Sequence, residues 1–208
     1  MICENCHKEN RGIAKFCKWC GKPLVSQDLL DKLVGLDEVK RQLKTIVDTY
    51  AYLRSRKDIV NVRISVNAVI IGETGTGKTA LAEILRDYFY QHKIIEKPKL
   101  TMVDAVDYQR FVDKWDDNIK KAKNGILFFD NVQKLLPDKY SNQVNPLDKL
   151  FVEVDKWEDN PIVVISGLPK GLDDFLESNP AVANRFKYTF RLPTPNFTEL
   201  TNICKLNL

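Results

Sequence analysis

The 208-residue sequence lacks any apolar run that is long enough to cross a membrane. Its longest runs, such as residues 68–71 and 162–165, fall far short of the roughly 18 to 20 residues that a spanning helix needs. Met1, Ile2 and Cys3 are followed at once by polar residues, without the basic and then apolar order of a secretory signal. We therefore predict a cytoplasmic protein with no membrane contact.

A strong excess of one charge is also missing. The formal net charge is +4, and it falls to about +2 if four cysteines are thiolates that hold one Zn²⁺. A charge this small gives no electrostatic argument for nucleic-acid binding. With 44% apolar and 29% charged residues, the composition is that of a globular chain with one ordinary core and a small appendage.

Cysteine is scarce except near the start, where Cys3, Cys6, Cys17 and Cys20 form two Cys-x-x-Cys pairs. Each pair directs two sulfurs at one point, and four thiolates make a closed tetrahedral zinc site that is structural rather than catalytic. Two disulfides or unrelated thiols are the alternatives, and a reducing cytoplasm disfavours the disulfides. The remaining Cys204 is predicted to be a half-buried thiol.

Residues 1–25 resemble the short zinc-ribbon modules found at the ends of many bacterial proteins, with Phe16 before the second cysteine pair. The resemblance implies a docking module. A protein partner is favoured over nucleic acid, because the net charge of the zinc-loaded segment is only about +1. Residues 26–32 are predicted to be a linker.

The central motif is GETGTGKT, which has the spacing of a phosphate-binding P-loop. It stands between a predicted buried strand and a predicted amphipathic helix, as the motif requires. Glycines let backbone N–H groups turn toward phosphates, Lys78 reaches the β and γ oxygens, and the Thr79 hydroxyl ligates Mg²⁺. The predicted phosphate-binding residues are Gly72, Glu73, Thr74, Gly75, Thr76, Gly77, Lys78 and Thr79.

Strands and helices are predicted to alternate along the rest of the chain. Strands are expected over 100–104, 126–130 and 162–166, and helices from Val39 to Leu53 with Asp37 as cap, around 111–122 and over 147–157. This alternation predicts an α/β fold, a parallel sheet with helices on both faces and ligands at the carboxyl ends of the strands. Asp130 and Ser166 end strands at that edge, where Asp130 can hold Mg²⁺ through water.

Together these motifs resemble the AAA+ ATPases, specifically the CbxX/CfqX group, over about residues 31–200. LVGLDEVKRQL is similar to the group's motif beside the adenine, GETGTGKT to its Walker A, ILFFDN to its Walker B and VVISG to its sensor 1 strand. LDDFLESNPAVANRF resembles the segment that leads to the arginine finger. The resemblance implies an AAA+ nucleotide-binding domain over residues 33–208 that uses ATP and Mg²⁺.

The same resemblance assigns roles to single residues. Val34, Gly35 and Leu36 would flank the base, Ser166 would be the sensor hydroxyl, and Arg185 would be the arginine finger. Such an arginine acts on a neighbouring subunit, so it implies a homo-oligomer, a hexamer in the family. A surface ion pair is the alternative for Arg185.

The main departure from the family pattern is Asn131, which replaces the glutamate after the Walker B aspartate. An amide can position the attacking water but cannot take its proton, and loss of a general base typically costs on the order of 10² to 10⁴ in rate. We therefore expect ATP binding with weak or absent hydrolysis, with Asn131 among the residues of the catalytic edge.

Two further departures concern polypeptide contacts and the lid. Asp113 stands where the family's pore loop has glycine, so Phe111 and Val112 either grip a polypeptide or belong to the core, which we favour. The chain ends at Leu208, where the family's helical lid would begin. We expect that the lid is lacking, that the cleft is open on one side and that ring formation is doubtful; the chain is a reduced form or the front piece of a longer protein.

These features predict a nucleotide-dependent protein-remodelling or docking component that its zinc ribbon delivers to a protein partner. One alternative is an active chaperone-like ATPase, with another acid or a partner subunit as the base. A second alternative is a nucleic-acid adaptor in which the zinc ribbon is the working part.

Overall fold

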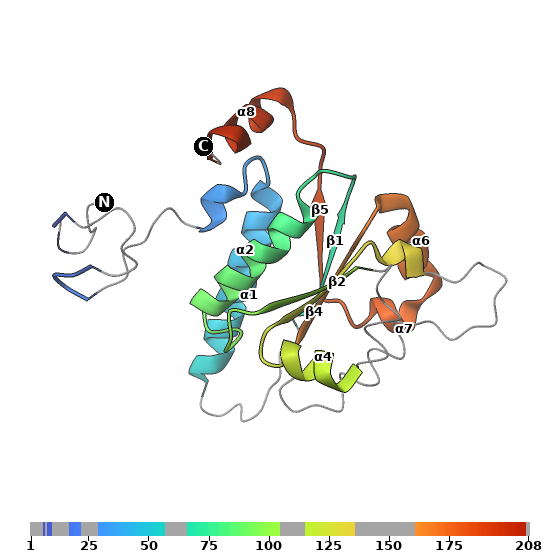
Figure 1. Ribbon diagram of the computed structural model, residues 1–208, viewed down its shortest axis with the longest axis horizontal. Coiled ribbons are helices and arrows are strands. Elements are labelled where there is room, and N and C mark those ends of the chain that lie inside the picture. The colour runs from blue at the N-terminus through green and yellow to red at the C-terminus, as the bar shows by residue number, and fades with distance from the viewer. Residues whose placement is uncertain are drawn as a thin grey trace.

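The computed structural model describes residues 6, 8–9, 17–21, 29–56, 66–104, 115–135 and 161–206. Cys3, the segment with Phe111 and Val112, and the helix predicted over 147–157 lie outside these ranges. The centre of the described fold is a five-stranded sheet with the spatial order β2-β3-β4-β1-β5 (Figure 1). All neighbouring strands are parallel, which confirms the predicted α/β fold.

The strands follow apolar runs in the sequence. Their bounds are β1 (Ala68–Gly72), β2 (Leu100–Asp104), β3 (Ile126–Asp130), β4 (Ile162–Gly167) and β5 (Tyr188–Leu192). β1 is buried at every position because helices cover both faces of the sheet. β5 was not predicted, because this edge strand alternates exposed and buried residues and gives no continuous apolar run.

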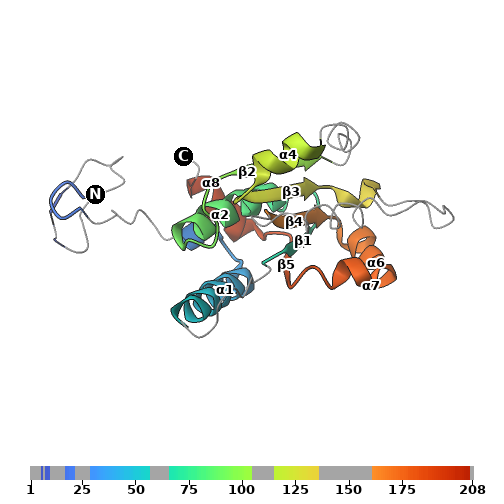
Figure 2. The same cartoon turned by 90° about the horizontal axis from the view of Figure 1, so that it is seen from below.

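The helices form two layers. One face of the sheet carries η1 (Leu29–Lys32), α1 (Asp37–Ser55) and α2 (Lys78–Gln91). The other carries α4 (Trp115–Ala122), η3 (Val132–Leu135), α6 (Pro169–Ser178) and α7 (Pro180–Ala183). Figures 1 and 2 show α1 and α2 on one side of β1 and β5, with α6 and α7 on the other. α8 (Phe197–Leu206) follows β5.

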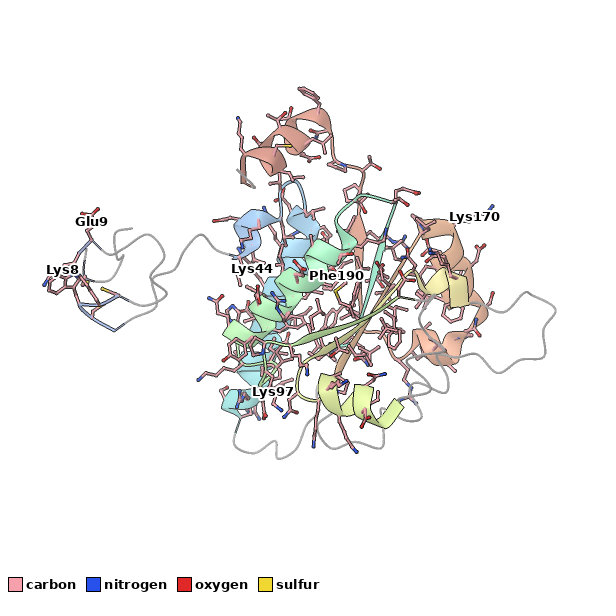
Figure 3. All side chains as sticks on the ribbon, viewed as in Figure 1. Lys8, Glu9, Lys44, Lys97, Lys170 and Phe190 are labelled. Carbon is pink, nitrogen blue, oxygen red and sulfur yellow. The ribbon has the colours of Figure 1, made fainter. Side chains whose placement is uncertain are left out.

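The period of two along the strands divides the core into two clusters. Phe128 of β3 and Phe190 of β5 pack with Leu43 and Phe89 of the helices α1 and α2, and Figure 3 shows Phe190 in the middle of the molecule. The alternate residues of β3, such as Phe129, face α4 and α6 instead. Because both faces are packed, the carboxyl ends of the strands are held at fixed positions.

Two expectations about single residues and one about a segment were wrong. Asp37 is the first residue of α1 rather than its cap, because Leu36 occupies the cap position and makes no side-chain cap hydrogen bond; the charge of Asp37 still suits the positive end of the helix dipole. Cys204 is exposed on α8 rather than half-buried. The predicted linker over 26–32 includes η1, whose Leu30 is only 2% exposed and belongs to the core.

Among the described residues, none of the helices combines the length and the apolar character that crossing a membrane requires.

Candidate functional site

The P-loop joins the end of β1 to the start of α2 and depends on glycine at several positions. Gly75 and Gly77 have φ angles of 82° and 90°, a left-handed conformation that residues with a Cβ rarely adopt. At Gly72 a Cβ would lie 2.5 Å from the Thr76 hydroxyl. The loop therefore brings its backbone to the first turn of α2, where free N–H groups favour an anion.

Lys78 lies across the base of this loop. Its side chain is only 8% exposed, and Nζ donates hydrogen bonds of 2.9 Å to the carbonyl oxygens of Gly72 and Glu73. The Thr76 hydroxyl donates to the same Glu73 oxygen at 2.9 Å. Thr79 is half-buried in the first turn of α2. A buried ammonium that only carbonyl dipoles hold is suited to exchange them for phosphate oxygens.

The carboxyl ends of β3 and β4 form the edge predicted for magnesium. The Ser166 hydroxyl, which is fully buried, donates to Asp130 Oδ1. The backbone N–H of Asn131 donates to the same oxygen at 3.0 Å. β4 lies between β1 and β3, with Ile70 of β1 opposite Ser166. The structure thus brings Ser166 and Asp130 together at the end of the sheet that carries the P-loop.

Asn131 makes a contact that the sequence did not predict. Its φ angle is 58°, the left-handed conformation that asparagine tolerates, and Nδ2 donates a long hydrogen bond of 3.5 Å to Asp104 Oδ2. Asp104 ends β2 and stands opposite Asp130 in the parallel register. The sequence does contain one hint of a role for Asp104, because it is an acidic residue at the end of the predicted strand 100–104. Its spacing from the other site residues matches no known motif, so the sequence alone did not assign it to the site.

A cleft of about 380 Å³ lies beside the P-loop, and we call it the α8 cleft. Val34, Gly35 and Leu36, the residues predicted to flank the base, line it together with Thr76 and Gly77. Its other walls come from Ile84 of α2, from Pro193 and Pro195 after β5, and from Glu199 and Ile203 of α8. The side that was expected to be open is therefore bordered by a helix, and α8 lies at the end of the sheet where β1 leads into α2 (Figure 1).

Glu199 fixes the wall of the α8 cleft opposite Gly35. Its carboxylate accepts from the Asn196 backbone N–H at 2.8 Å, and its own N–H donates to Asn196 Oδ1 at 2.9 Å. This reciprocal pair is a capping box, for which the sequence NFTE is a signal that was missed. Gly35 has a φ angle of +70°, and a Cβ there would overlap Glu199 Oε1. Glycine thus allows α8 to approach the cleft.

Two arginines near this end of the sheet are paired with aspartates. A hydrogen bond from Arg86 to Asp87 raises the pKa of Arg86, and both residues line the α8 cleft. A hydrogen-bonded ion pair with Asp173 of α6 raises the pKa of Arg191 on β5. Both guanidinium groups are therefore held by a neighbouring carboxylate, and the Arg86–Asp87 pair forms part of the wall of the α8 cleft.

Arg185, the predicted arginine finger, is exposed and lies between α7 and β5. β5 runs from Tyr188 toward the P-loop edge, so Arg185 lies at the opposite, amino-terminal edge of the sheet. The structure does not bring it to the phosphate loop of its own chain. This placement agrees with action on a neighbouring subunit, which stays a prediction.

Three of the four predicted zinc ligands are described, and they lie together. The sulfur atoms of Cys6, Cys17 and Cys20 lie within 4.8 Å of one another, and no disulfide joins these three cysteines. The Gly21 N–H donates to the Cys17 oxygen at 2.9 Å, and the Trp19 N–H donates to the Cys17 sulfur at 3.4 Å. A turn that directs the Trp19 N–H at the Cys17 sulfur suits a metal-bound thiolate.

Comparison with known proteins places these features in one family. Residues 68–193 match the family model described as "ATPase family associated with various cellular activities (AAA)". The chain is 26% identical to stage V sporulation protein K of Bacillus subtilis, with 85% of this chain and 57% of that protein covered. It is 25% identical to the ESX-1 secretion system protein EccA1 of Mycolicibacterium smegmatis, with 87% of this chain and 33% of that protein covered.

The chain therefore spans about a third to just over half of the length of these relatives. Among solved structures, the Thermotoga maritima RuvB Holliday junction branch migration motor superposes with a TM-score of 0.58 at 19% identity, covering 85% of this chain and 51% of that one. At this identity the likeness shows the fold alone, a P-loop NTPase sheet with its helices.

Proposed function

Since the chain belongs to the AAA family of ATPases, whose model covers residues 68–193, we propose that it is a nucleotide-dependent protein-remodelling or docking module that binds Mg·ATP and hydrolyses it slowly. The observation that carries this proposal is the P-loop. Its left-handed glycines and the buried Lys78 form a cradle that suits phosphates. Assignment to the CbxX/CfqX group stays a prediction.

The described residues fit a nucleotide with its metal. Lys78 and the backbone of residues 72–79 would hold the phosphates, and the α8 cleft would take the base between Gly35 and α8. Thr79 and Asp130 supply the oxygen atoms that Mg²⁺ prefers. Mg²⁺ held there would supply positive charge that offsets the charge of the phosphates. Ser166 holds the Asp130 carboxylate in place.

Slow hydrolysis is proposed because Asn131, the residue that follows β3, is an amide where a general base is needed. Asn131 can orient a water molecule but cannot accept its proton. The backbone N–H of Asn131 donates to Asp130 and is not part of the P-loop. Replacing glutamate by asparagine at position 131 therefore leaves the phosphate cradle intact. The bound nucleotide would then control docking for a long time, rather than supply energy through repeated hydrolysis.

Calorimetric titration of Mg·ATP into the zinc-loaded protein tests this proposal. We expect one site per chain, and Lys78→Ala should weaken binding roughly 10- to 100-fold, because a charge-assisted hydrogen bond contributes about 1.5 to 3 kcal/mol. Lys97→Ala is a matched control, since this exposed lysine precedes β2 at the amino-terminal edge of the sheet, opposite the P-loop (Figure 3). Absence of heat with the wild-type protein would refute the proposal. Brisk turnover that Lys78→Ala abolishes would refute the slow rate and favour the active chaperone-like ATPase.

We also propose that the cysteine cluster holds one structural zinc ion. Three sulfurs already lie within 4.8 Å of one another, and Cys3 would complete four thiolate ligands, the set expected for a structural site. One zinc per chain by elemental analysis is the expected result. Cys17→Ser should lower this value to near zero, whereas Cys204→Ser should not change it. Retained zinc in Cys17→Ser would contradict the site.

The cluster is further proposed to dock a protein partner. Trp19 is 56% exposed, and the ammonium groups of Lys8 and Lys18 lie 4.6 and 4.7 Å from its ring centre. Exposed tryptophan is a frequent anchor of protein interfaces, and the two cations favour an acidic partner surface. Immobilised protein should capture a partner in a nucleotide-dependent way, and Trp19→Ala should abolish capture. Salt-dependent binding of single-stranded DNA or RNA instead would favour the nucleic-acid adaptor.

Assembly and location complete the proposal. We propose a cytoplasmic homo-oligomer in which Arg185 of one chain contacts the nucleotide of the next. Light scattering should show a larger species with Mg·ATP than without it. Arg185→Ala should lower turnover and leave the Kd for Mg·ATP within about threefold, because the residue lies away from its own P-loop. A monomer under both conditions would contradict the assembly.

A further inference from the structure

The carboxylate that is missing at position 131 is present one strand away. Asp104 and Asp130 stand opposite each other at the carboxyl ends of β2 and β3, and adjacent strands lie about 4.8 Å apart. Asn131 Nδ2 donates to Asp104 Oδ2 at 3.5 Å. The acid and the amide thus lie side by side, with the acid on β2 and the amide on β3.

Asp130 cannot serve in the same way. One of its oxygens already accepts from the Ser166 hydroxyl and from the Asn131 N–H, and its position beside Ser166 suits a metal ligand. Among the described residues that end β2, β3 and β4, Asp104 is the other carboxylate.

From this arrangement we infer that Asp104 is the general base for the hydrolysis that this chain retains, and that Asn131 is the positioning residue that holds it. The inference rests on the proposed function, because it assumes that Mg·ATP occupies the P-loop. The attacking water forms a bond to the γ-phosphorus and gives its proton to Asp104. The bond between that phosphorus and the β–γ bridging oxygen breaks, and ADP leaves with the electron pair.

The strand order also accounts for a slow rate. β4 and β3 separate β2 from the P-loop strand β1. Asp104 at the end of β2 therefore lies one strand farther from the P-loop than residue 131, which follows β3. An aspartate side chain is short, and the water must bridge the remaining distance. Misplacement of a catalytic group by about 1 Å can cost on the order of 100-fold in rate.

The test uses Asp104→Asn, the exchange variant Asp104→Asn with Asn131→Asp, and Asp174→Asn as control. Asp174 is exposed on α6, so its variant should match the wild type. Asp104→Asn should lower kcat at least about tenfold, less than the 10² to 10⁴ that a well-placed general base contributes, and leave the Kd for Mg·ATP within about threefold. The exchange variant should recover at least about tenfold of the loss, because it returns one carboxylate to the same pair.

A second measurement does not depend on turnover. The complex of Mg·ADP with aluminium fluoride mimics the phosphoryl group under attack. Asp104→Asn should weaken the binding of this complex at least tenfold, about 1.4 kcal/mol, while Asp174→Asn leaves it unchanged.

Three results would overturn the inference. The first is turnover by Asp104→Asn that stays within threefold of the wild-type rate. The second is an exchange variant no faster than Asp104→Asn, and the third is a wild-type protein that binds Mg·ATP and never cleaves it; in this last case the proposed binding function stands. Failure to bind Mg·ATP would overturn both.

Discussion

Gly35→Ala probes how α8 is held against the cleft. In the wild type, Gly35 has a φ angle of +70° and leaves no room for a Cβ beside Glu199 Oε1. Alanine in the left-handed conformation costs about 1 kcal/mol. The new methyl group must also displace the Glu199 side chain, which ends its hydrogen bond with the Asn196 N–H and costs about 1 kcal/mol of capping energy. The free energy of unfolding should therefore fall by about 2 kcal/mol.

A double-mutant cycle separates the two terms. In the Glu199→Ala background the capping bond is already lost, so Gly35→Ala should cost only about 1 kcal/mol. For a chain of this size, about 2 kcal/mol corresponds to a Tm lowered by roughly 4 to 8 °C. Scanning calorimetry without nucleotide measures all four proteins.

Gly75→Ala is the matched control for this cycle. Gly75 also has a positive φ angle, but a Cβ there would meet nothing within 4 Å. It should lose the same amount of stability, about 1 kcal/mol, in both backgrounds. If Gly35→Ala costs as much with Glu199 as with alanine at 199, the contact between Gly35 and α8 does not hold in solution.

Three further perturbations have simpler expectations. Phe128→Ala should lower the free energy of unfolding by about 3 to 5 kcal/mol in chemical denaturation, because this fully buried ring lies at the centre of one core cluster; a loss below 1 kcal/mol would contradict that packing. Arg191→Ala should cost less than about 1 kcal/mol in the same assay, because its ion pair with Asp173 is largely exposed. Zinc chelation should leave the main melting transition in place, since Cys6, Cys17 and Cys20 form a cluster separate from both core clusters; loss of that transition would show coupling.

Local patterns predicted most of the sheet and of the phosphate site. The apolar runs that became β1 and β3 and the spacing of the P-loop are contained in short segments, so their placement needed no knowledge of distant residues. The contacts of Glu199 with Gly35 and of Asp104 with Asn131 join residues far apart in the chain. They depend on where α8 and β2 pack, which sequence periodicity does not encode. β5 was missed because two of its five positions are exposed and interrupt the apolar run.

The pairing of Asn131 with Asp104 changes what a restored glutamate should do. Asn131→Glu supplies a base on β3, but it removes the amide that donates to Asp104 and places a second carboxylate against it. Like charges at this separation repel each other, which raises the energy of the arrangement in which a carboxylate orients the attacking water. Asn131→Glu combined with Asp104→Asn returns one acid and one amide to the pair.

The double variant should therefore hydrolyse ATP faster than Asn131→Glu alone, by about tenfold if the repulsion is about 1.4 kcal/mol. Single-turnover rates at saturating Mg·ATP compare them without a contribution from binding. Equal rates would mean that residue 131 and Asp104 do not interact when nucleotide is bound. A faster double variant would show that a second carboxylate beside residue 131 hinders cleavage at this edge of the sheet.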